Sequence, residues 1–221
     1  MDIHDYKTII FDCDGVILNS NKIKSEAFRI VASQYGDKEA RKLVTYNKEN
    51  GGVSRYVKFN YFINEIITTK NKLNQIPNID YLLNQFSKNV VNGLNICELV
   101  KDLGKLKKAS INASWMVISG GDQSELRQVF NKRDLTKFFD KGIFGSPVPK
   151  DEIFKREIEK GSIIKPALFI GDSKFDYECS INSGIDFVFA HQWTEFNDWK
   201  EFCSKNKIKT IDYVTNLTGI V

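Results

Sequence analysis

Short apolar runs that end in polar residues or glycines recur along the chain. Residues 8–11 (TIIF) end at an acidic loop, residues 115–118 (WMVI) end at Ser-Gly-Gly, and residues 167–170 (ALFI) end at Gly-Asp-Ser. Continuous apolar and β-branched runs of this length are typical of strands buried in a parallel sheet. Residues 185–190 and the shorter run 143–144 predict two further strands.

Helical patterns alternate with these strands, at residues 123–130, 150–160 and 177–183. Strands that alternate with helices predict an α/β fold, here a Rossmann-like three-layer α/β/α core with a parallel sheet. Ligands of such open sheets bind at the carboxyl ends of the strands. We therefore expect three residues that follow apolar runs to converge despite their separation in sequence: Asp12, Ser119 and Asp172.

Residues 20–92 differ from the rest of the chain, because they are rich in helix-forming and aromatic residues and contain no comparable strand run. Residues 24–35, 56–69 and 81–89 have periodic apolar faces, with a Gly51-Gly52 turn between the first two. We interpret 20–92 as an inserted α-helical cap, and 1–19 with 93–221 as the core. The alternative, a first helical layer of the core, requires about seventy residues in one crossover connection, which is too many.

Composition and charge narrow the function classes. The 32 basic and 28 acidic residues give a net charge of +4. The sequence lacks the interleaved basic and aromatic residues that would indicate nucleic-acid binding, so we expect none. The N-terminus has no signal-peptide pattern, and no apolar run approaches the ~20 residues of a membrane span. The four cysteines lack the spacing of a disulfide scaffold. We expect a cytoplasmic protein that binds no membrane, either a monomer or a homodimer.

Two acidic clusters follow predicted strands. Asp12 and Asp14 come directly after the first strand, and Asp172 and Asp176 follow another. Carboxylates are costly to keep together unless a cation holds them, and an all-oxygen ligand set favours Mg²⁺. A solvated acidic turn is the alternative for the first cluster alone. Asp176 lies one helical turn after Asp172, where it would either support the metal shell or cap the helix.

Two further features suit a phosphate group. Ser119 and Gly120 lie between a strand and a helix, where a hydroxyl and exposed backbone N–H groups can cradle phosphate, although Ser-Gly-Gly is also an ordinary turn. Lys150 opens a helix, where a cation opposes the local dipole. This unfavourable placement suggests a functional reason, whereas a lone lysine would otherwise be read as a surface residue.

These elements together resemble a known family. The sequences DCDGV, VISGG, Lys150 and GDSKFD, in this order and at strand ends, resemble the four motifs of the haloacid dehalogenase superfamily. The helical insert resembles the cap of its phosphoglycolate phosphatase and β-phosphoglucomutase branch. The resemblance covers the whole chain, and the four motifs in combination are much more specific than any one of them.

The resemblance implies a role for each residue. Asp12 would be the nucleophile that forms an aspartyl-phosphate, and Asp14 the general acid and then base. Mg²⁺ would be held by Asp12, the backbone carbonyl of Asp14, and Asp172. Lys150 and the Ser119-Gly120 segment would bind the phosphoryl oxygens.

The resemblance also suggests how the cap selects a substrate. The sequence GGVSR, which ends at Arg55, resembles a substrate-contacting loop of this branch. Arg55 would bind the part of the substrate that is not transferred. The alternative is an arginine at a helix start that faces solvent.

Asp14 favours phosphate esters, because dehalogenases and phosphonatases of the superfamily lack this second aspartate. Lys24 stands near the place of a histidine found in the mutases, which counts against mutase activity. We therefore expect a Mg²⁺-dependent phosphatase of a small phosphorylated metabolite, such as a sugar phosphate or a phosphoglycolate-like compound. The alternatives are a β-phosphoglucomutase-like mutase and a catalytically idle member that binds a metabolite or a partner protein.

Overall fold

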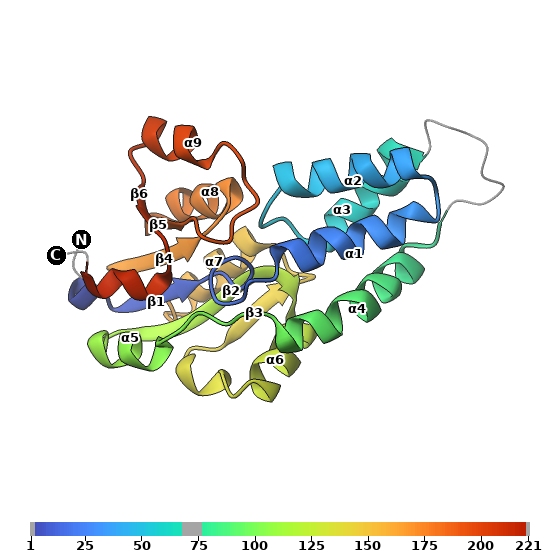
Figure 1. The fold of residues 1–221 in the computed structure, drawn as a ribbon. Helices are drawn as coiled ribbons and strands as arrows, with labels where there is room; N and C mark the ends of the chain where they lie inside the picture. Colours follow the sequence, from blue (N-terminus) through green and yellow to red (C-terminus); the bar gives the residue numbers. More distant parts are fainter. Residues whose placement is uncertain (1–2, 68–76, 220–221) are drawn as a thin grey trace.

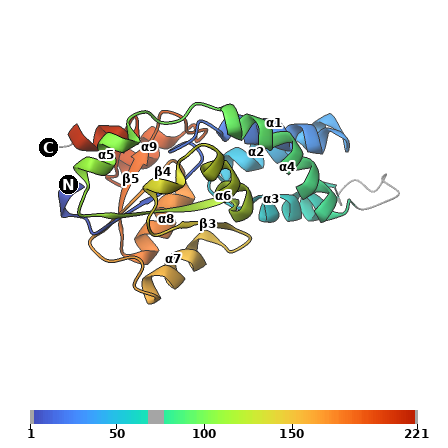
Figure 2. The same cartoon turned by 90° about the horizontal axis from the view of Figure 1, so that it is seen from below.

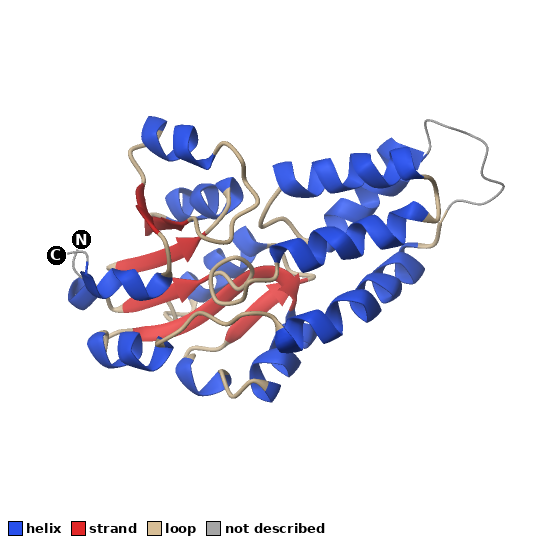
Figure 3. Cartoon of the chain, viewed as in Figure 1, coloured by secondary structure: helices blue, strands red, loops and turns tan. Residues whose placement is uncertain are grey.

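The computed structural model describes residues 3–67 and 77–219. A six-stranded sheet, parallel throughout, lies at the centre of the larger part (Figures 1 and 3), with the strand order β3-β2-β1-β4-β5-β6. The strands are β1 (Thr8–Phe11), β2 (Ser114–Asp122), β3 (Ile143–Ser146), β4 (Ala167–Gly171), β5 (Asp186–Ala190) and β6 (Lys209–Ile211). This order places β1 in the interior, between β2 and β4, at the point where the direction of winding reverses.

The sheet is covered by helices on both faces, because every strand at its centre is apolar on both sides. In β1, Ile9 and Phe11 pack into one apolar cluster and Ile10 packs into the other, as the alternation of a strand requires. Each such buried side chain contributes about 1.5–3 kcal/mol to folding. The first face is covered by α5 (Leu103–Ala109) and α6 (Gln123–Lys132), and the second by α7 (Lys150–Glu159), α8 (Lys174–Ser183) and α9 (Trp199–Lys205). The predicted three-layer α/β fold is confirmed.

Four helices form a separate group beyond the carboxyl end of the sheet (Figures 1 and 2). They are α1 (Asn21–Ser33), α2 (Asp37–Glu49), α3 (Arg55–Tyr61) and α4 (Ile79–Ile96), and a π-helical turn, Phe62–Ile67, continues α3. Phe28 packs between Phe59 and Phe86, with ring centroids 5.1 and 4.4 Å away. The chain leaves the sheet after β1 and returns to it after α4.

Three of these helices were predicted, although residues 68–69 of the second prediction lie outside the described part of the chain. Helix α2 was not predicted, because its sequence, DKEARKLVTYNKE, has only two buried apolar side chains, Ala40 and Leu43. The short strand β6 was also not predicted, since Ile211 is its single buried residue.

Strand β2 is longer than the sequence suggested. Ser119, Gly120 and Gly121 are part of the strand and do not form a turn, and β2 continues to Asp122. Asp122 then caps α6, because its Oδ1 accepts a hydrogen bond of 3.0 Å from the backbone N–H of Glu125. In the described part of the chain, no helix is long and apolar enough to cross a membrane.

Candidate active site

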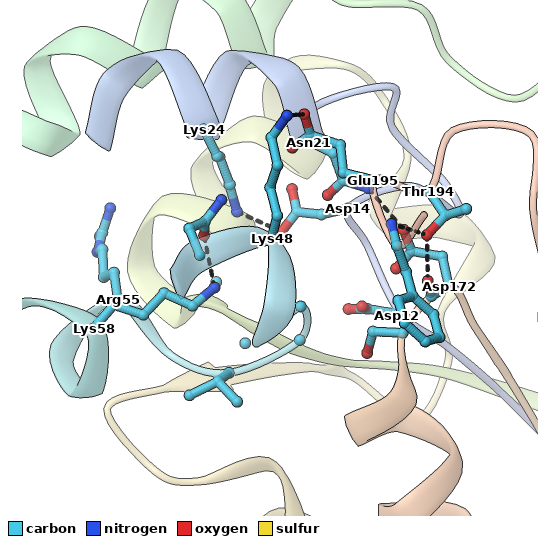
Figure 4. A pocket seen from close by; sticks show the side chains of 18 of the residues that line it. Asp12, Asp14, Asn21, Lys24, Lys48, Arg55, Lys58, Asp172, Thr194 and Glu195 are labelled. Carbon is cyan, nitrogen blue, oxygen red and sulfur yellow. Dashed lines mark hydrogen bonds and ion pairs between the residues drawn. The ribbon is translucent and has the colours of Figure 1, made fainter. Parts of the chain in front are cut away.

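The sheet register brings the predicted site residues to one edge. Phe11, the last residue of β1, lies opposite Val117 of β2 and Ile170 of β4. Asp12, Ser119 and Asp172 come one or two residues after these positions, so they lie at the same edge of the sheet, although β2 itself continues to Asp122. Asp12, Ser119 and Asp172 are all buried there. Figure 4 shows the pocket above this edge. The pocket is lined by residues near the ends of the strands and by side chains from α1, α2 and α3. The predicted convergence is therefore present in the structure.

Three buried carboxylates lie together at this edge. Asp12, Asp172 and Asp176 each have an oxygen within 4.8 Å of the others. Burial raises the pKa of Asp12 to about 7, although Lys150 opposes the shift. Burial and the Asp176 charge raise the pKa of Asp172 well above its ordinary value. The cluster thus carries more negative charge than its surroundings stabilise, and its oxygen ligands fit a hard divalent cation such as Mg²⁺.

Asp176 has a structural role that the sequence left as one of two options. It forms a capping box with Ser173, in which its Oδ2 accepts the backbone N–H of Ser173 at 3.1 Å and the Ser173 hydroxyl at 2.7 Å. The same Oδ2 accepts the backbone N–H of Asp172 at 3.2 Å, and Oδ1 forms an ion pair with Lys150. Both oxygens are occupied, so Asp176 caps α8 and positions the residues beside it.

Lys150 is a buried residue of the site, so its reading as a surface lysine is wrong. It is 3% exposed, its Nζ lies 3.3 Å from Asp12 Oδ2, and it also pairs with Asp176. Burial alone would lower its pKa, but the two carboxylates raise it above the ordinary lysine value. Lys150 is therefore a fixed positive charge next to Asp12, and this interaction offsets its unfavourable position at the start of α7.

Asp14 points to the helical side of the pocket. It accepts a hydrogen bond of 2.5 Å from the Ser20 hydroxyl and forms an ion pair with Lys24 of α1. Burial would raise the pKa of Asp14, but Lys24 and Ser20 lower it below its ordinary value. Figure 4 shows Lys24 reaching down to Asp14. Sequence reasoning noted the position of Lys24 but did not predict this contact.

The Gly51-Gly52 loop lies directly against the site. A Cβ atom on Gly120 would be 2.2 Å from the carbonyl oxygen of Gly52, and a Cβ atom on Gly52 would be 2.6 Å from Ser173 Oγ. Gly52 also has a φ of 77°, which favours glycine. Ser119 Oγ accepts the backbone N–H of Gly121 at 3.1 Å. The loop is therefore in close contact with the proposed phosphate-binding segment, which only residues without side chains permit.

Arg55 does not face solvent, contrary to the alternative for this residue. It is 8% exposed, its Nη1 lies 3.1 Å from Glu125 Oε2, and its Nη2 lies 3.5 Å from Asp122 Oδ2. Arg55 thus joins α3 to the start of α6, with two carboxylates as partners. It also lines the pocket.

Other residues of the site gave no signal in the sequence. Asn21 Nδ2 donates to Asp172 Oδ2 at 2.7 Å and to the Trp193 carbonyl at 3.0 Å, and Thr194 Oγ1 donates to the Asp172 carbonyl at 2.6 Å. Together they fix the orientation of Asp172.

Asn47 and Lys58 also line the pocket. Asn47 and Lys58 are ordinary polar residues of α2 and α3, and only the packing of distant segments brings them to the pocket.

Comparisons with known proteins relate most of the chain to one family. The family model for haloacid dehalogenase-like hydrolases matches residues 9–190. A phosphorylated carbohydrates phosphatase of Thermotoga maritima is 24% identical over 83% of this chain and 84% of its own length. Two solved structures share the fold: a predicted phosphoglycolate phosphatase of Haemophilus somnus (TM-score 0.73, 17% identity, 98% of each chain) and CbbY of Rhodobacter sphaeroides in complex with phosphate (0.64, 15%, 84% and 86%).

Because the family model covers most of its length, the chain belongs to the haloacid dehalogenase-like hydrolase family. This confirms the superfamily that the four motifs predict and makes the chain a member of a hydrolase family.

Proposed function

We propose that the protein is a Mg²⁺-dependent phosphatase that hydrolyses a small phosphorylated carbohydrate or a metabolite of similar size through an aspartyl-phosphate on Asp12. One observation carries this proposal: Asp12 is buried at the end of β1, with Asp172 on one side and the Lys150 ammonium 3.3 Å away. The carbohydrate substrate is supported by the name of the Thermotoga maritima relative.

In this proposal the chain performs two in-line displacements. An Asp12 carboxylate oxygen attacks phosphorus while the bond from phosphorus to the substrate oxygen breaks, and Asp14 gives a proton to the departing oxygen. Asp14 then takes a proton from water, the water oxygen attacks phosphorus, and the aspartyl-phosphate bond breaks to release inorganic phosphate. Lys150 and the backbone N–H groups at Ser119-Gly120 stabilise the charge on the phosphoryl oxygens.

Asp12, Asp172 and the backbone carbonyl of Asp14 would hold the cation. Bound Mg²⁺ would supply neutralisation of charge between Asp12 and the phosphoryl group. Asn21 and Thr194 orient Asp172 for this purpose, and Asp176 keeps Lys150 in place.

Residues 20–92 would act as the cap of this enzyme. Their helices supply one wall of the pocket, and the Gly52 carbonyl packs on Gly120 in the arrangement seen here. Exclusion of water by this contact would protect the aspartyl-phosphate until the leaving group has departed.

The test is the release of phosphate from p-nitrophenyl phosphate with and without Mg²⁺. Asp12→Asn should lose all turnover and the acid-labile phosphoenzyme, since an amide cannot attack phosphorus in this way. Asp80→Asn, at an exposed position of α4, is the matched control. Near-normal turnover by Asp12→Asn would contradict the proposal.

The mutase alternative has its own test. With a hexose 1-phosphate as substrate, we expect inorganic phosphate and free sugar. Accumulation of the 6-phosphate isomer would show instead that the phosphoryl group is returned to the sugar.

A further inference from the structure

The pocket contains one buried cation whose charge has no carboxylate partner in the part of the chain that the structure describes. Lys58 of α3 is 6% exposed and lines the pocket. Its Nζ donates to Asn47 Oδ1 at 2.7 Å and lies 5.7 Å from the centre of the Phe28 ring. An ammonium group has three donors, so the Asn47 oxygen satisfies one of them. Figure 4 shows Lys58 reaching from α3 into the pocket.

The other cations around the pocket are paired with acidic residues. Lys24 pairs with Asp14, and Lys150 pairs with Asp12 and Asp176. The remaining two pairs are Lys48 with Glu195, at 3.4 Å, and Arg55 with Asp122 and Glu125. Because burying an unpaired charge is costly, the Lys58 ammonium is the position in the pocket where an anion would gain most.

The surroundings of Lys58 disfavour its charged form. Burial lowers its pKa to about 7, and the neighbouring charge of Lys24 adds to the decrease. Asp14 opposes the shift but forms its ion pair with Lys24 instead. A bound anion would restore the charged form.

The Lys58 side chain is held in place by a chain of hydrogen bonds. Asn47 Nδ2 donates to Ser25 Oγ at 2.9 Å, and the Ser25 hydroxyl donates to Glu195. This chain turns the amide oxygen of Asn47 toward Lys58, and it links three helices of the cap to a loop of the core. The position of the ammonium is therefore set before any ligand binds, which lowers the cost of binding.

We propose that Lys58, held by Asn47, binds a second anionic group on the substrate, a carboxylate or a further phosphate, at the end that is not transferred. The inference rests on the proposed phosphatase function and makes its substrate class narrower. It assigns to Lys58 the role that the sequence suggested for Arg55, whose guanidinium is already paired with two carboxylates.

The first experiment compares matched substrates that differ only in the second anion. One pair is 2-phosphoglycolate and 2-hydroxyethyl phosphate, and the other is glucose 1,6-bisphosphate and glucose 6-phosphate. In at least one pair, the wild-type protein should prefer the member that carries the second anionic group (below, the anionic member). We expect a preference of roughly 10- to 100-fold in kcat/KM, the range expected of a charged hydrogen bond. The pair that shows the preference identifies the anion.

The Lys58→Met variant should lose this preference through a higher KM for the anionic substrate. It should lower kcat/KM for the member without the second anion, and for p-nitrophenyl phosphate, by a smaller factor than for the member that carries it, because neither offers a second anion to this site. Lys58→Arg should keep part of the preference. Lys42→Met, an exposed lysine of α2, is the matched control and should behave as wild type.

Binding separates this inference from the proposed function. Calorimetric titration of the same four compounds into Asp12→Asn protein, with and without Lys58→Met, measures the site without turnover. A loss of affinity confined to the anionic members would support the Lys58 site even if no hydrolysis is found. Equal affinity for both members of each pair, or an equal loss for both in Lys58→Met, would overturn the proposal while leaving the phosphatase function standing.

Discussion

The two sides of the pocket each contain a buried lysine, and these lysines differ in one respect. Lys150 at the sheet edge and Lys58 on the helical side are 3% and 6% exposed. Lys150 has two carboxylate partners and a raised pKa, whereas Lys58 has an amide partner and a pKa lowered to about 7. Burial is nearly equal, so the acidic partners decide the charge state. At the sheet edge, carboxylates of the protein neutralise the Lys150 charge. On the helical side, the proposed ligand would supply the negative charge that Lys58 lacks.

The largest expected effect comes from breaking the paired side. Lys150→Met removes the cation between Asp12 and Asp176 and leaves both carboxylates uncompensated. We expect a loss of about 3–5 kcal/mol in the free energy of unfolding, with turnover too low to detect. Urea denaturation measures the change in the free energy of unfolding, and Lys160→Met, at the exposed residue that follows the end of α7, is the control. A stability loss below about 1 kcal/mol would show that the pairing is not what holds this side together.

Addition of Mg²⁺ should stabilise the same side without any mutation. Because Asp12 and Asp172 repel each other when both are ionised, a cation that binds the folded state should raise the free energy of unfolding by about 2.7 kcal/mol at a hundred times its Kd. Thermal unfolding with EDTA and with Mg²⁺ gives this difference. Asp172→Asn should remove most of it. An unchanged Mg²⁺ response in this variant would argue against Asp172 as a ligand.

The unpaired side should respond to pH instead. The pKa of Lys58 is about 7 in the folded protein and 10.5 for an ordinary lysine, so between these values the unfolded chain binds more protons and the wild type gains stability as pH rises. Lys58→Met lacks this gain. Its stability advantage over the wild type should therefore be full below pH 7 and fall by roughly 2–3 kcal/mol by pH 9. Lys42→Met should show a difference that stays flat across the same range.

The smallest effect concerns the link between the two sides. Glu195 on a core loop accepts the Ser25 hydroxyl and pairs with the partly exposed Lys48. Glu195→Gln keeps an acceptor but loses the charge, so it should cost about 0.2–1 kcal/mol, and Glu26→Gln at the exposed pair with Arg29 should cost no more. Urea denaturation compares the two. A clearly larger loss in the free energy of unfolding for Glu195→Gln than for Glu26→Gln would show that the hydrogen bonds through Ser25 depend on one another.

The sequence predicts the sheet edge better than the helical side for a physical reason. Residues 8–11 form a continuous apolar run, so β1 and the place of Asp12 follow from a local pattern. The meeting of Asp12 with Asp172 follows from a general rule about parallel strands. Roles drawn from the motifs, such as those of Ser119 and Asp14, remain predictions that the geometry accommodates.

The helical side depends on contacts between distant segments, which no local pattern reveals. Lys58 is buried because Phe28 and Asn47 pack around it, and Arg55 pairs with Glu125, 70 residues away. Helix α2 is difficult to predict because few of its residues are apolar. Asn47 is buried while most of the other polar residues of α2 face solvent, and the sequence alone does not distinguish them.

The contact between Gly52 and Gly120 limits how closely the two parts of the molecule can approach. A methyl group at position 120 would occupy the space of the Gly52 carbonyl oxygen, which is 2.2 Å from that point. We expect an alanine there to hold the helical group away from the sheet edge by about the width of a methyl group. The distance between the helical group and the sheet edge at this point is therefore set by the main chain of residues 52 and 120.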